Sequence, residues 1–364
     1  MTAMPSAPLA RASAAAADRL RRWLLSPAVQ LRDGPAAGGV VGAFDADGSP
    51  RYTYPEIAGY YLHWLAELAH CRVSDGLDAH AGRSAAWAQR ALAGDAPPQT
   101  RHYLVAAPPD WRNDASFFFD LAMLLRGLTA AAESALIPLP QDSLARLVRE
   151  LAHFVSADGS LRAARPVRPA ADLPARWSTC GGPFEVKASS RVLLAARHLD
   201  LPAALATACA REAERHAPHA ATMDLDMLHP TLYFAEGLLL AQPQRAPALV
   251  QLLDRCLSLQ RADGSLPEAA SGSDLPRSDI IAQALRLGLL LHSSATLDAA
   301  RRAHLDALVQ ALLARVGNDG TLAFVPGTPA PQPNVWCGLF AEQALRWYAR
   351  WSEGQSLPTA EWLV

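Results

Sequence analysis

The sequence has few of the features that mark several common classes of protein. Only 5 of its 364 residues are cysteines, an odd number without a framework spacing, which favours free thiols in a reducing compartment such as the cytoplasm. No apolar run approaches the ~20 residues of a membrane-spanning helix. Neither sign of charge dominates (33 basic and 35 acidic residues), so neither nucleic acid nor an anionic membrane surface is an expected partner.

Signals for targeting segments, cofactors and β-structure are equally sparse. The alanine-rich start of the chain is interrupted by Arg11 and Asp18, so we expect no secretory signal, and we expect residues 1–11 to be flexible. No glycine-rich phosphate loop appears, so we expect no nucleotide cofactor. Runs of β-branched residues, such as VVGAF at 40–44, are short and lie in predicted loops. The sequence therefore favours an all-α protein.

An Asp-Gly turn recurs along the chain. It occurs in FDADGSP (Asp47-Gly48), SADGSL (Asp158-Gly159), RADGSL (Asp263-Gly264) and GNDGTL (Asp319-Gly320), which are separated by 111, 105 and 56 residues. The first two intervals are about twice the third, which indicates a unit of roughly 55 residues. Six such units fill the sequence.

Each unit contains two amphipathic or apolar segments with helical periodicity. The first helices are predicted at 12–28, 80–93, 141–156, 201–216, 245–260 and 297–316. The second helices are predicted at 55–71, 114–135, 184–199, 229–241, 278–293 and 335–352.

The two kinds of segment differ in how much of their surface is apolar. LARLVRELAHFV and HLDALVQALLARV are apolar on one side, whereas SFFFDLAMLLRGLTAAA and IIAQALRLGLLL are apolar nearly all round. A helix of the second kind must be buried on every side. The alternation predicts an all-α toroid, with an outer and an inner ring of helices, over residues 1–364 as a single domain.

This organisation resembles the (α/α)6 toroid shared by glycoside hydrolases, polysaccharide lyases, sugar epimerases, terpene cyclases and lanthionine cyclases. In detail, YPEIAGYYL (54–62) and LHPTLYFAEGLLL (228–240) resemble an uncharacterised bacterial toroid family with a YPE-x-x-GY helix start. Members of that family tend to accompany polysaccharide biosynthesis genes. The resemblance implies a carbohydrate setting and a saccharide or other small-molecule substrate.

Polar and aromatic residues gather at the starts of the predicted inner helices. Burying such groups without partners costs several kcal/mol each, so a shared binding cavity would explain the whole set. The catalytic candidates are Glu56, Asp114, His229 and Asp279. The substrate-binding candidates are Tyr54, Tyr60, Trp111, Trp177, Lys187, Arg191, Tyr233, Arg277 and Trp336.

The candidates suggest metal-independent acid–base chemistry on a sugar, of the hydrolase, lyase or epimerase type. Glu56 follows the first-turn Pro55 and lies one turn from Tyr60, and partial desolvation beside tyrosine rings would raise its pKa toward general-acid use. His229 could accept a proton with Tyr233 one turn away. Asp114 and Asp279 could flank a sugar as a carboxylate pair.

Other interpretations of the same residues remain open. Each acid could simply cap a helix, and the tryptophans could fill space between helices. The segment TMDLDMLH resembles the aspartate-rich motif of class II terpene cyclases, although Met227 stands where that motif ends in aspartate. Cys180, Cys337 and His229 resemble the zinc ligands of lanthionine cyclases, but they come from distant units, so we expect no metal. A non-catalytic glycan-binding or scaffold protein is the third alternative.

Overall fold

The computed structural model describes residues 7–45, 47–106, 109–168, 172–271, 275–292, 297–327 and 333–364. Within the expected single domain, which stays a prediction, the chain forms two compact units. Unit 1 comprises Met1–Ser26, Ala46–Gly48 and Ala217–Val364, and unit 2 comprises Pro27–Asp45 and Ser49–His216. Each unit is described by itself.

Unit 2 is built on three helices that are buried nearly all round: α2 (Pro55–His70), α4 (Phe118–Glu133) and α7 (Glu185–Ala195). Helix α2 packs against α4, and α4 packs against α7. Three helices with one buried face cover them, namely α3 (Leu77–Ala91), α5 (Gln141–Ala152) and α8 (Ala203–His216). The short helix α6 (Trp177–Cys180) precedes α7.

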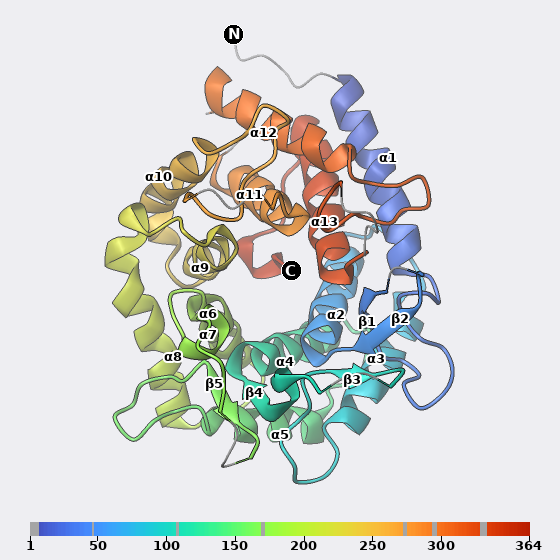
Figure 1. Cartoon of the computed structure of the whole chain (residues 1–364), viewed down its shortest axis with the longest axis vertical. Coiled ribbons are helices and arrows are strands. Elements are labelled where there is room, and N and C mark those ends of the chain that lie inside the picture. The colour runs from blue at the N-terminus through green and yellow to red at the C-terminus, as the bar shows by residue number, and fades with distance from the viewer. Residues whose placement is uncertain are drawn as a thin grey trace. The chain divides into compact units, whose positions relative to one another are not determined.

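Unit 1 repeats this arrangement (Figure 1). Its buried helices are α9 (Leu228–Ala241), α11 (Ser278–Leu291) and α13 (Val335–Ser352), with α11 in contact with both others. The one-sided helices are α10 (Ala246–Leu257), α12 (Ala299–Leu313) and α1 (Ala7–Leu24), and α1 packs along α13. The 3-10 helices of this unit are η2 (Ala217–Thr222), η3 (Pro243–Arg245) and η4 (Ala360–Trp362).

All twelve predicted helices are present, and the alternation of one-sided and all-round burial is confirmed. Several boundaries were wrong, among them the ends of α1, α5 and α7, which come earlier than predicted. Helix α1 begins at Ala7, inside the segment expected to be flexible, and α4 begins at Phe118 rather than at residue 114. The second difference changes which acid lies at the start of α4.

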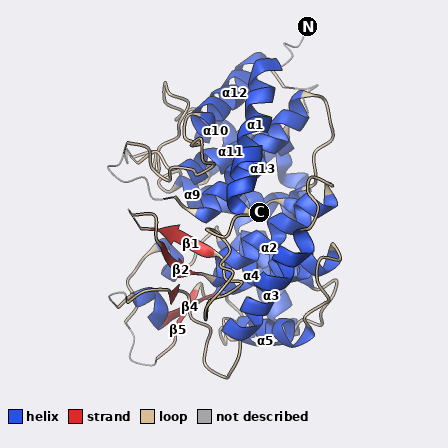
Figure 2. Ribbon diagram, turned by 90° about the vertical axis from the view of Figure 1, so that its right-hand side faces the viewer, coloured by secondary structure: helices blue, strands red, loops and turns tan. Residues whose placement is uncertain are grey.

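Short strands lead the chain of unit 2 into its buried helices. Strands β1 (Val41–Phe44), β2 (Pro50–Thr53) and β3 (His102–Tyr103) form an antiparallel sheet in that order. Strands β4 (Ala115–Phe117) and β5 (Ala164–Pro166) form a second antiparallel pair. Figure 2 shows the strands gathered on one side of the helices of this unit. Strand β2 ends one residue before α2, and β4 ends directly before α4, so each positions the first turn of a buried helix.

The recurring Asp-Gly turn closes the loop after three of the one-sided helices. Gly159, Gly264 and Gly320 have φ of 78°, 80° and 83°, a left-handed conformation that glycine adopts without strain. The preceding aspartate accepts a hydrogen bond from the backbone N–H two residues on, as Asp319 does from Thr321. A Cβ on Gly264 would lie 2.2 Å from the carbonyl oxygen of Ala307 in α12, so the turn packs directly on the next one-sided helix.

The first turn of the repeat was assigned to the wrong glycine. Gly48 lies between β1 and β2, and a Cβ there would meet open space. The counterpart of Gly264 is instead Gly38, which has φ of 85° and whose added Cβ would lie 2.1 Å from the carbonyl oxygen of Arg83 in α3. The loop that carries it is longer and has its Asp-Gly pair at Asp33-Gly34 rather than at Gly38, so its sequence does not resemble the others.

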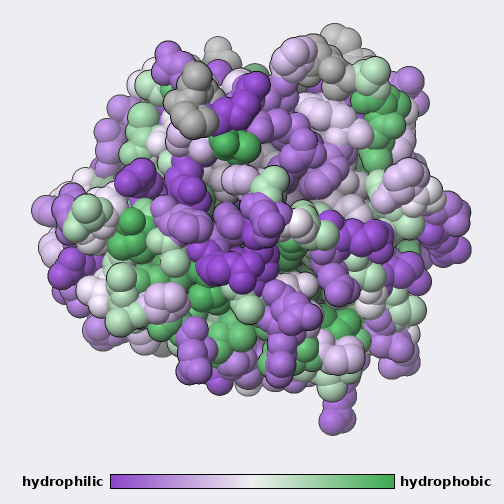
Figure 3. Space-filling view, turned by 90° about the horizontal axis from the view of Figure 1, so that it is seen from below, coloured by the Kyte–Doolittle hydropathy of each residue, from purple (hydrophilic) through white to green (hydrophobic). Residues whose placement is uncertain are grey.

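Hydrophilic and hydrophobic side chains are interspersed on the face drawn in Figure 3. Among the described helices, none combines the length and the apolar character that crossing a membrane would require.

Candidate functional site

Two glycines place the starts of α2 and α4 side by side. A Cβ on Gly59 would lie 2.4 Å from the carbonyl oxygen of Met123, and one on Gly127 would lie 2.3 Å from the carbonyl oxygen of Gly59. The two helix backbones therefore touch, which any larger residue would prevent. This contact explains the glycine in the YPEIAGYY segment, and it brings the first turns of both helices together.

The first turns of α2 and α4 supply a pair of acids, Glu56 and Asp120. The hydroxyl of Tyr54 donates a hydrogen bond of 3.0 Å to Oδ2 of Asp120 and also lies within reach of Glu56. Burial raises the pKa of Glu56 to about 7, against the opposing effects of the Tyr54 hydrogen bond and of Lys187 and Arg101.

The pKa of Asp120 is raised even more clearly. The cause is burial, to which the neighbouring charge of Glu56 adds. Two carboxyl groups this close do not both ionise readily, so near neutral pH the pair holds a proton that it can donate. Glu56 was a predicted catalytic residue. Asp120 was missed because its helix was expected to begin at Asp114.

Cationic side chains surround the pair. Arg101 and Arg112 both bind Asp110, at 2.8 Å and 3.2 Å. Tyr103 donates a third hydrogen bond to the same carboxylate, at 2.8 Å. These partners outweigh burial and keep the pKa of Asp110 below its ordinary value. Lys187 in α7 is fully buried, with Nζ 5.1 Å from the ring centroid of Tyr60, so these two predicted binding residues lie together.

The predicted aromatic platforms of unit 2 differ in their surroundings. The ring of Trp111 has the guanidinium groups of Arg112 and Arg176 at 4.7 Å and 5.8 Å from its centroid. Trp177 is 36% exposed and contacts Phe184 edge-on, with centroids 4.8 Å apart. Trp177 is thus more accessible for stacking on a sugar. The predicted binding residue Arg191 is buried within α7.

Asp114 lies apart from the acid pair, in the 3-10 helix η1 (Trp111–Asp114) that precedes β4. Its side chain is 36% exposed and forms an ion pair with Arg168. The first-turn position expected for Asp114 is filled by Asp120.

A further buried acid, Glu185, begins α7. It is 3% exposed, and neither of its carboxyl oxygens has a hydrogen-bond partner among the described residues. Burial and the nearby acids Glu212 and Asp120 raise its pKa well above the ordinary value. The sequence signal for Glu185, as for Asp120, is an acid in the first turn of an otherwise apolar helix.

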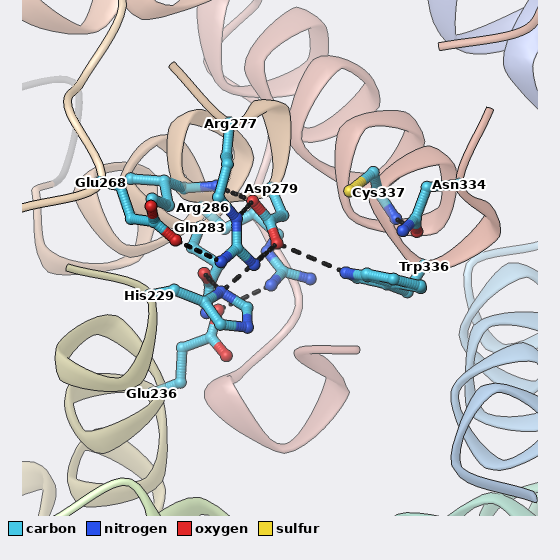
Figure 4. Close-up of polar contacts among 11 residues, drawn as sticks. His229, Glu236, Glu268, Arg277, Asp279, Gln283, Arg286, Asn334, Trp336 and Cys337 are labelled. Carbon is cyan, nitrogen blue, oxygen red and sulfur yellow. Dashed lines mark hydrogen bonds and ion pairs between the residues drawn. The ribbon is translucent and has the colours of Figure 1, made fainter. Parts of the chain in front are cut away.

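Unit 1 holds a separate polar cluster around His229, at the start of α9 (Figure 4). Nδ1 of His229 lies 2.7 Å from Oε1 of Gln283 and 3.5 Å from Oδ2 of Asp279, both on α11. Because an amide oxygen can only accept, the Gln283 contact places the imidazole proton on Nδ1. The imidazole of His229 lies over the ring of Tyr233, with centroids 4.3 Å apart.

Asp279 is completely buried and held by several donors. Arg277 donates to both carboxylate oxygens, at 2.6 Å and 3.2 Å, and the indole N–H of Trp336 in α13 donates at 3.3 Å. Burial alone would raise the pKa of Asp279, but His229, Arg277 and Trp336 together lower it. Asp279 is therefore suited to stay ionised beside the histidine and poorly suited to donate a proton.

Deeper in unit 1, Arg286 and Glu236 form a fully buried ion pair at 2.6 Å. The same guanidinium donates to Gln343 and to the carbonyl oxygen of Val364, at 3.0 Å and 2.9 Å. These bonds fasten residues of α9, α11 and α13 to one another. They have a structural role and support the helices that carry the His229 cluster.

The residues behind the other interpretations are placed less favourably. Asp224 and Asp226 of the terpene-cyclase-like segment are both exposed, and Asp224 accepts a hydrogen bond from the backbone N–H of Asp226. Cys180 is exposed, whereas burial raises the pKa of Cys337. No three His, Cys, Asp or Glu side chains within the described ranges are grouped to hold a metal ion.

Comparison with known proteins reveals the fold. No protein-family model matches this chain, and no curated protein sequence is similar to it. Solved structures similar to the chain include cellobiose 2-epimerase from Bacillus thermoamylovorans B4167, with a TM-score of 0.69, 9% identity and coverage of 92% of this chain and 98% of that one. A D-mannose isomerase matches with a TM-score of 0.67, 12% identity and coverage of 95% and 98%.

A third similar structure is the type II terpene cyclase MstE from Scytonema, with a TM-score of 0.62, 11% identity and coverage of 94% and 99%. These likenesses extend over nearly the whole chain at low identity. The chain has the (α/α)6 toroid fold, as the sequence predicted.

Proposed function

We propose that this protein is a carbohydrate-active enzyme that works by general acid–base catalysis. The observation that carries the proposal is the Glu56–Asp120 pair, in which Tyr54 bridges two acids whose pKa values burial raises. An acid–base catalyst is most effective when its pKa lies near the working pH, which the value of about 7 for Glu56 satisfies. The names of fold neighbours, a sugar epimerase and a mannose isomerase among them, support a saccharide substrate.

In the proposed reaction, Glu56 exchanges a proton with the sugar. Asp120 and Tyr54 hold the pair in its singly protonated state, because the phenol can donate to whichever carboxylate is ionised. Lys187 and Arg101, both close enough to lower the pKa of Glu56, would stabilise negative charge that develops during the transfer.

Within unit 1 taken by itself, we assign His229 as the proton-transferring group of its polar cluster. With its Nδ1 proton directed at Gln283, the other ring nitrogen is the basic one. Asp279 supports this group through its charge, and Arg277 and Trp336 position Asp279. We do not pair Asp114 with Asp279, because the two residues belong to different compact units. Exposed Trp177 is the proposed stacking platform for a sugar ring.

We also propose a setting in polysaccharide biosynthesis in the cytoplasm. The YPE-x-x-GY resemblance supports the first part. The odd number of cysteines without framework spacing supports the second.

The test is to incubate the protein with reducing sugars and glycosides in deuterium oxide and to follow them by proton NMR. Loss of a carbon-bound proton signal would indicate epimerisation or isomerisation, and a new reducing end would indicate hydrolysis. Glu56→Gln and Asp120→Asn should each lower turnover at least about 100-fold, the usual contribution of a general acid or base.

Glu214→Gln, at an exposed position of α8, is the matched control and should leave turnover unchanged. Full activity in both site variants would refute the proposal. Retained saccharide binding without any turnover by the wild type would instead favour a glycan-binding protein.

A further inference from the structure

We propose that the substrate is an anionic saccharide, whose carboxylate or phosphate group binds Arg101 and Arg112 beside the Glu56–Asp120 pair. The inference rests on the proposed function, since it names the substrate class of that same site. Its first support is the balance of charge around the two acids.

Three cationic side chains act on the pair. Arg101 and Lys187 lower the pKa of Glu56, and Arg101 and Arg112 lower that of Asp120, so all three lie close to the carboxyl groups. Arg101 and Arg112 both bind the single carboxylate of Asp110, so two guanidinium charges share one anionic partner. The neighbourhood of the pair therefore carries a positive charge that a neutral sugar would leave uncompensated.

The arginines also have hydrogen-bonding capacity to spare. Each donates one guanidinium N–H to an oxygen of Asp110, and a guanidinium has five such donors. The Nε–H of Arg101 is buried without a partner among the described residues. The side chains of Arg101 and Arg112 are 19% and 33% exposed, so donors of these side chains other than the buried Nε–H of Arg101 can reach a ligand. Planar guanidinium groups bind carboxylate and phosphate in a bidentate manner, which favours an anion over a hydroxyl group.

Anion binding at these arginines has a consequence for Glu56. The groups that face Glu56 are Tyr54, Asp120 of α4, Lys187 of α7 and Arg101. A bound anion would offset the positive charge of Arg101, which is one of the influences that keep Glu56 ionised. Glu56 should then take up a proton when the substrate binds. The charged group of the substrate would thus help to prepare the acid form of the catalyst.

Isothermal titration calorimetry tests both parts without requiring turnover. D-glucuronate, D-glucose 6-phosphate and D-glucose would be titrated near pH 7, in buffers with different heats of ionisation. The dependence of the observed heat on the buffer gives the number of protons taken up. The test variants are Arg112→Gln, Arg101→Gln and Glu56→Gln, and Arg112 is the more exposed of the two arginines. Arg149→Gln, on the exposed face of α5, is the matched control.

At least one anionic sugar should bind about tenfold or more tightly than glucose, the preference expected of a charge-assisted hydrogen bond. The relative affinity of glucuronate and glucose 6-phosphate would identify the anion. Arg112→Gln and Arg101→Gln should remove the preference, and Arg149→Gln should keep it. Glu56→Gln should still bind the anion but lose the proton uptake.

Equal binding of glucose and both anions, no binding of either anion, or an undiminished preference in Arg112→Gln would each overturn the inference. These results are distinct from failure of the proposed function. Binding of anionic sugars through Arg112 without any turnover would refute the proposed enzyme function but would support the proposed anion-binding site. Glu56-dependent turnover of neutral sugars alone would support the proposed enzyme function and refute the anion-binding site.

Discussion

Replacing Glu56 by glutamine should make the stability of the protein less dependent on pH. In the folded state the pKa of Glu56 is about 7, against an ordinary value of 4.5. Between these two pH values the unfolded chain is ionised at this residue while the folded chain is protonated. Raising the pH therefore favours unfolding, and the stability that depends on protonated Glu56 is fully lost above the pKa of the folded state.

The magnitude follows from the difference between the two pKa values. A rise of about 2.5 corresponds to about 3.4 kcal/mol, of which about 2.5 kcal/mol falls between pH 5 and pH 8. The glutamine variant cannot ionise at this position and should lack this loss. It should also relieve Asp120 of a neighbouring negative charge, and this second effect has the same sign.

Urea denaturation followed by circular dichroism, at about pH 5 and about pH 8, measures the free energy of unfolding of each protein. The advantage of Glu56→Gln over the wild type should grow by about 2.5 kcal/mol between the two pH values. Glu214→Gln at an exposed site provides the control and should show no such growth. Parallel pH profiles for the wild type and Glu56→Gln would show that Glu56 is not held in its protonated form by the fold.

Three further predictions concern packing, charge and tautomer. Gly59→Ala should lower the free energy of unfolding by at least about 2 kcal/mol, because its Cβ would overlap the α4 backbone. Gly82→Ala, where the added Cβ meets open space, should be neutral or stabilising by up to about 1 kcal/mol. Equal effects of the two substitutions in thermal melts would contradict the helix contact. Arg277→Met should destabilise the protein by about 3–5 kcal/mol, because it removes the counter-ion of the buried Asp279 carboxylate. Adding Asp279→Asn should restore much of the lost stability. An Arg277→Met variant as stable as the wild type would be inconsistent with this charge pair. Nitrogen-15 NMR should show the ring proton of His229 on Nδ1 in the wild type, and Gln283→Leu should shift this imidazole toward the other tautomer. An unchanged spectrum would exclude control of the tautomer by the Gln283 amide.

Much of the helical framework could be predicted from the sequence, because burial on one side or on all sides leaves a direct imprint on residue pattern. LARLVRELAHFV and SFFFDLAMLLRGLTAAA differ in this way, and they form a one-sided and an all-round buried helix. The turn glycines were recognisable where aspartate accompanied them. Gly38 escaped notice because its role depends on contact with α3, to which no local pattern points.

The candidate site was only partly predictable, for a related reason. Glu56 and His229 stand at helix starts beside aromatic residues, which is a visible local signal. Asp120 lies within an apolar run, and only the strand pairing of β4 reveals that its helix begins at Phe118. The ionisation of each acid was beyond local reasoning too. Asp279 and Asp120 occupy similar first-turn positions, yet Arg277 holds the pKa of one down while burial raises that of the other.

The glycine contact between α2 and α4 affects how this protein can change during evolution. No side chain separates the two backbones at Gly59 and Gly127, so the spacing of the acids above them depends on main-chain dimensions. Apolar residues elsewhere around these helices can be exchanged for others of similar volume without moving Glu56 relative to Asp120. Homologues should therefore diverge widely in their cores while both small residues persist at the crossing.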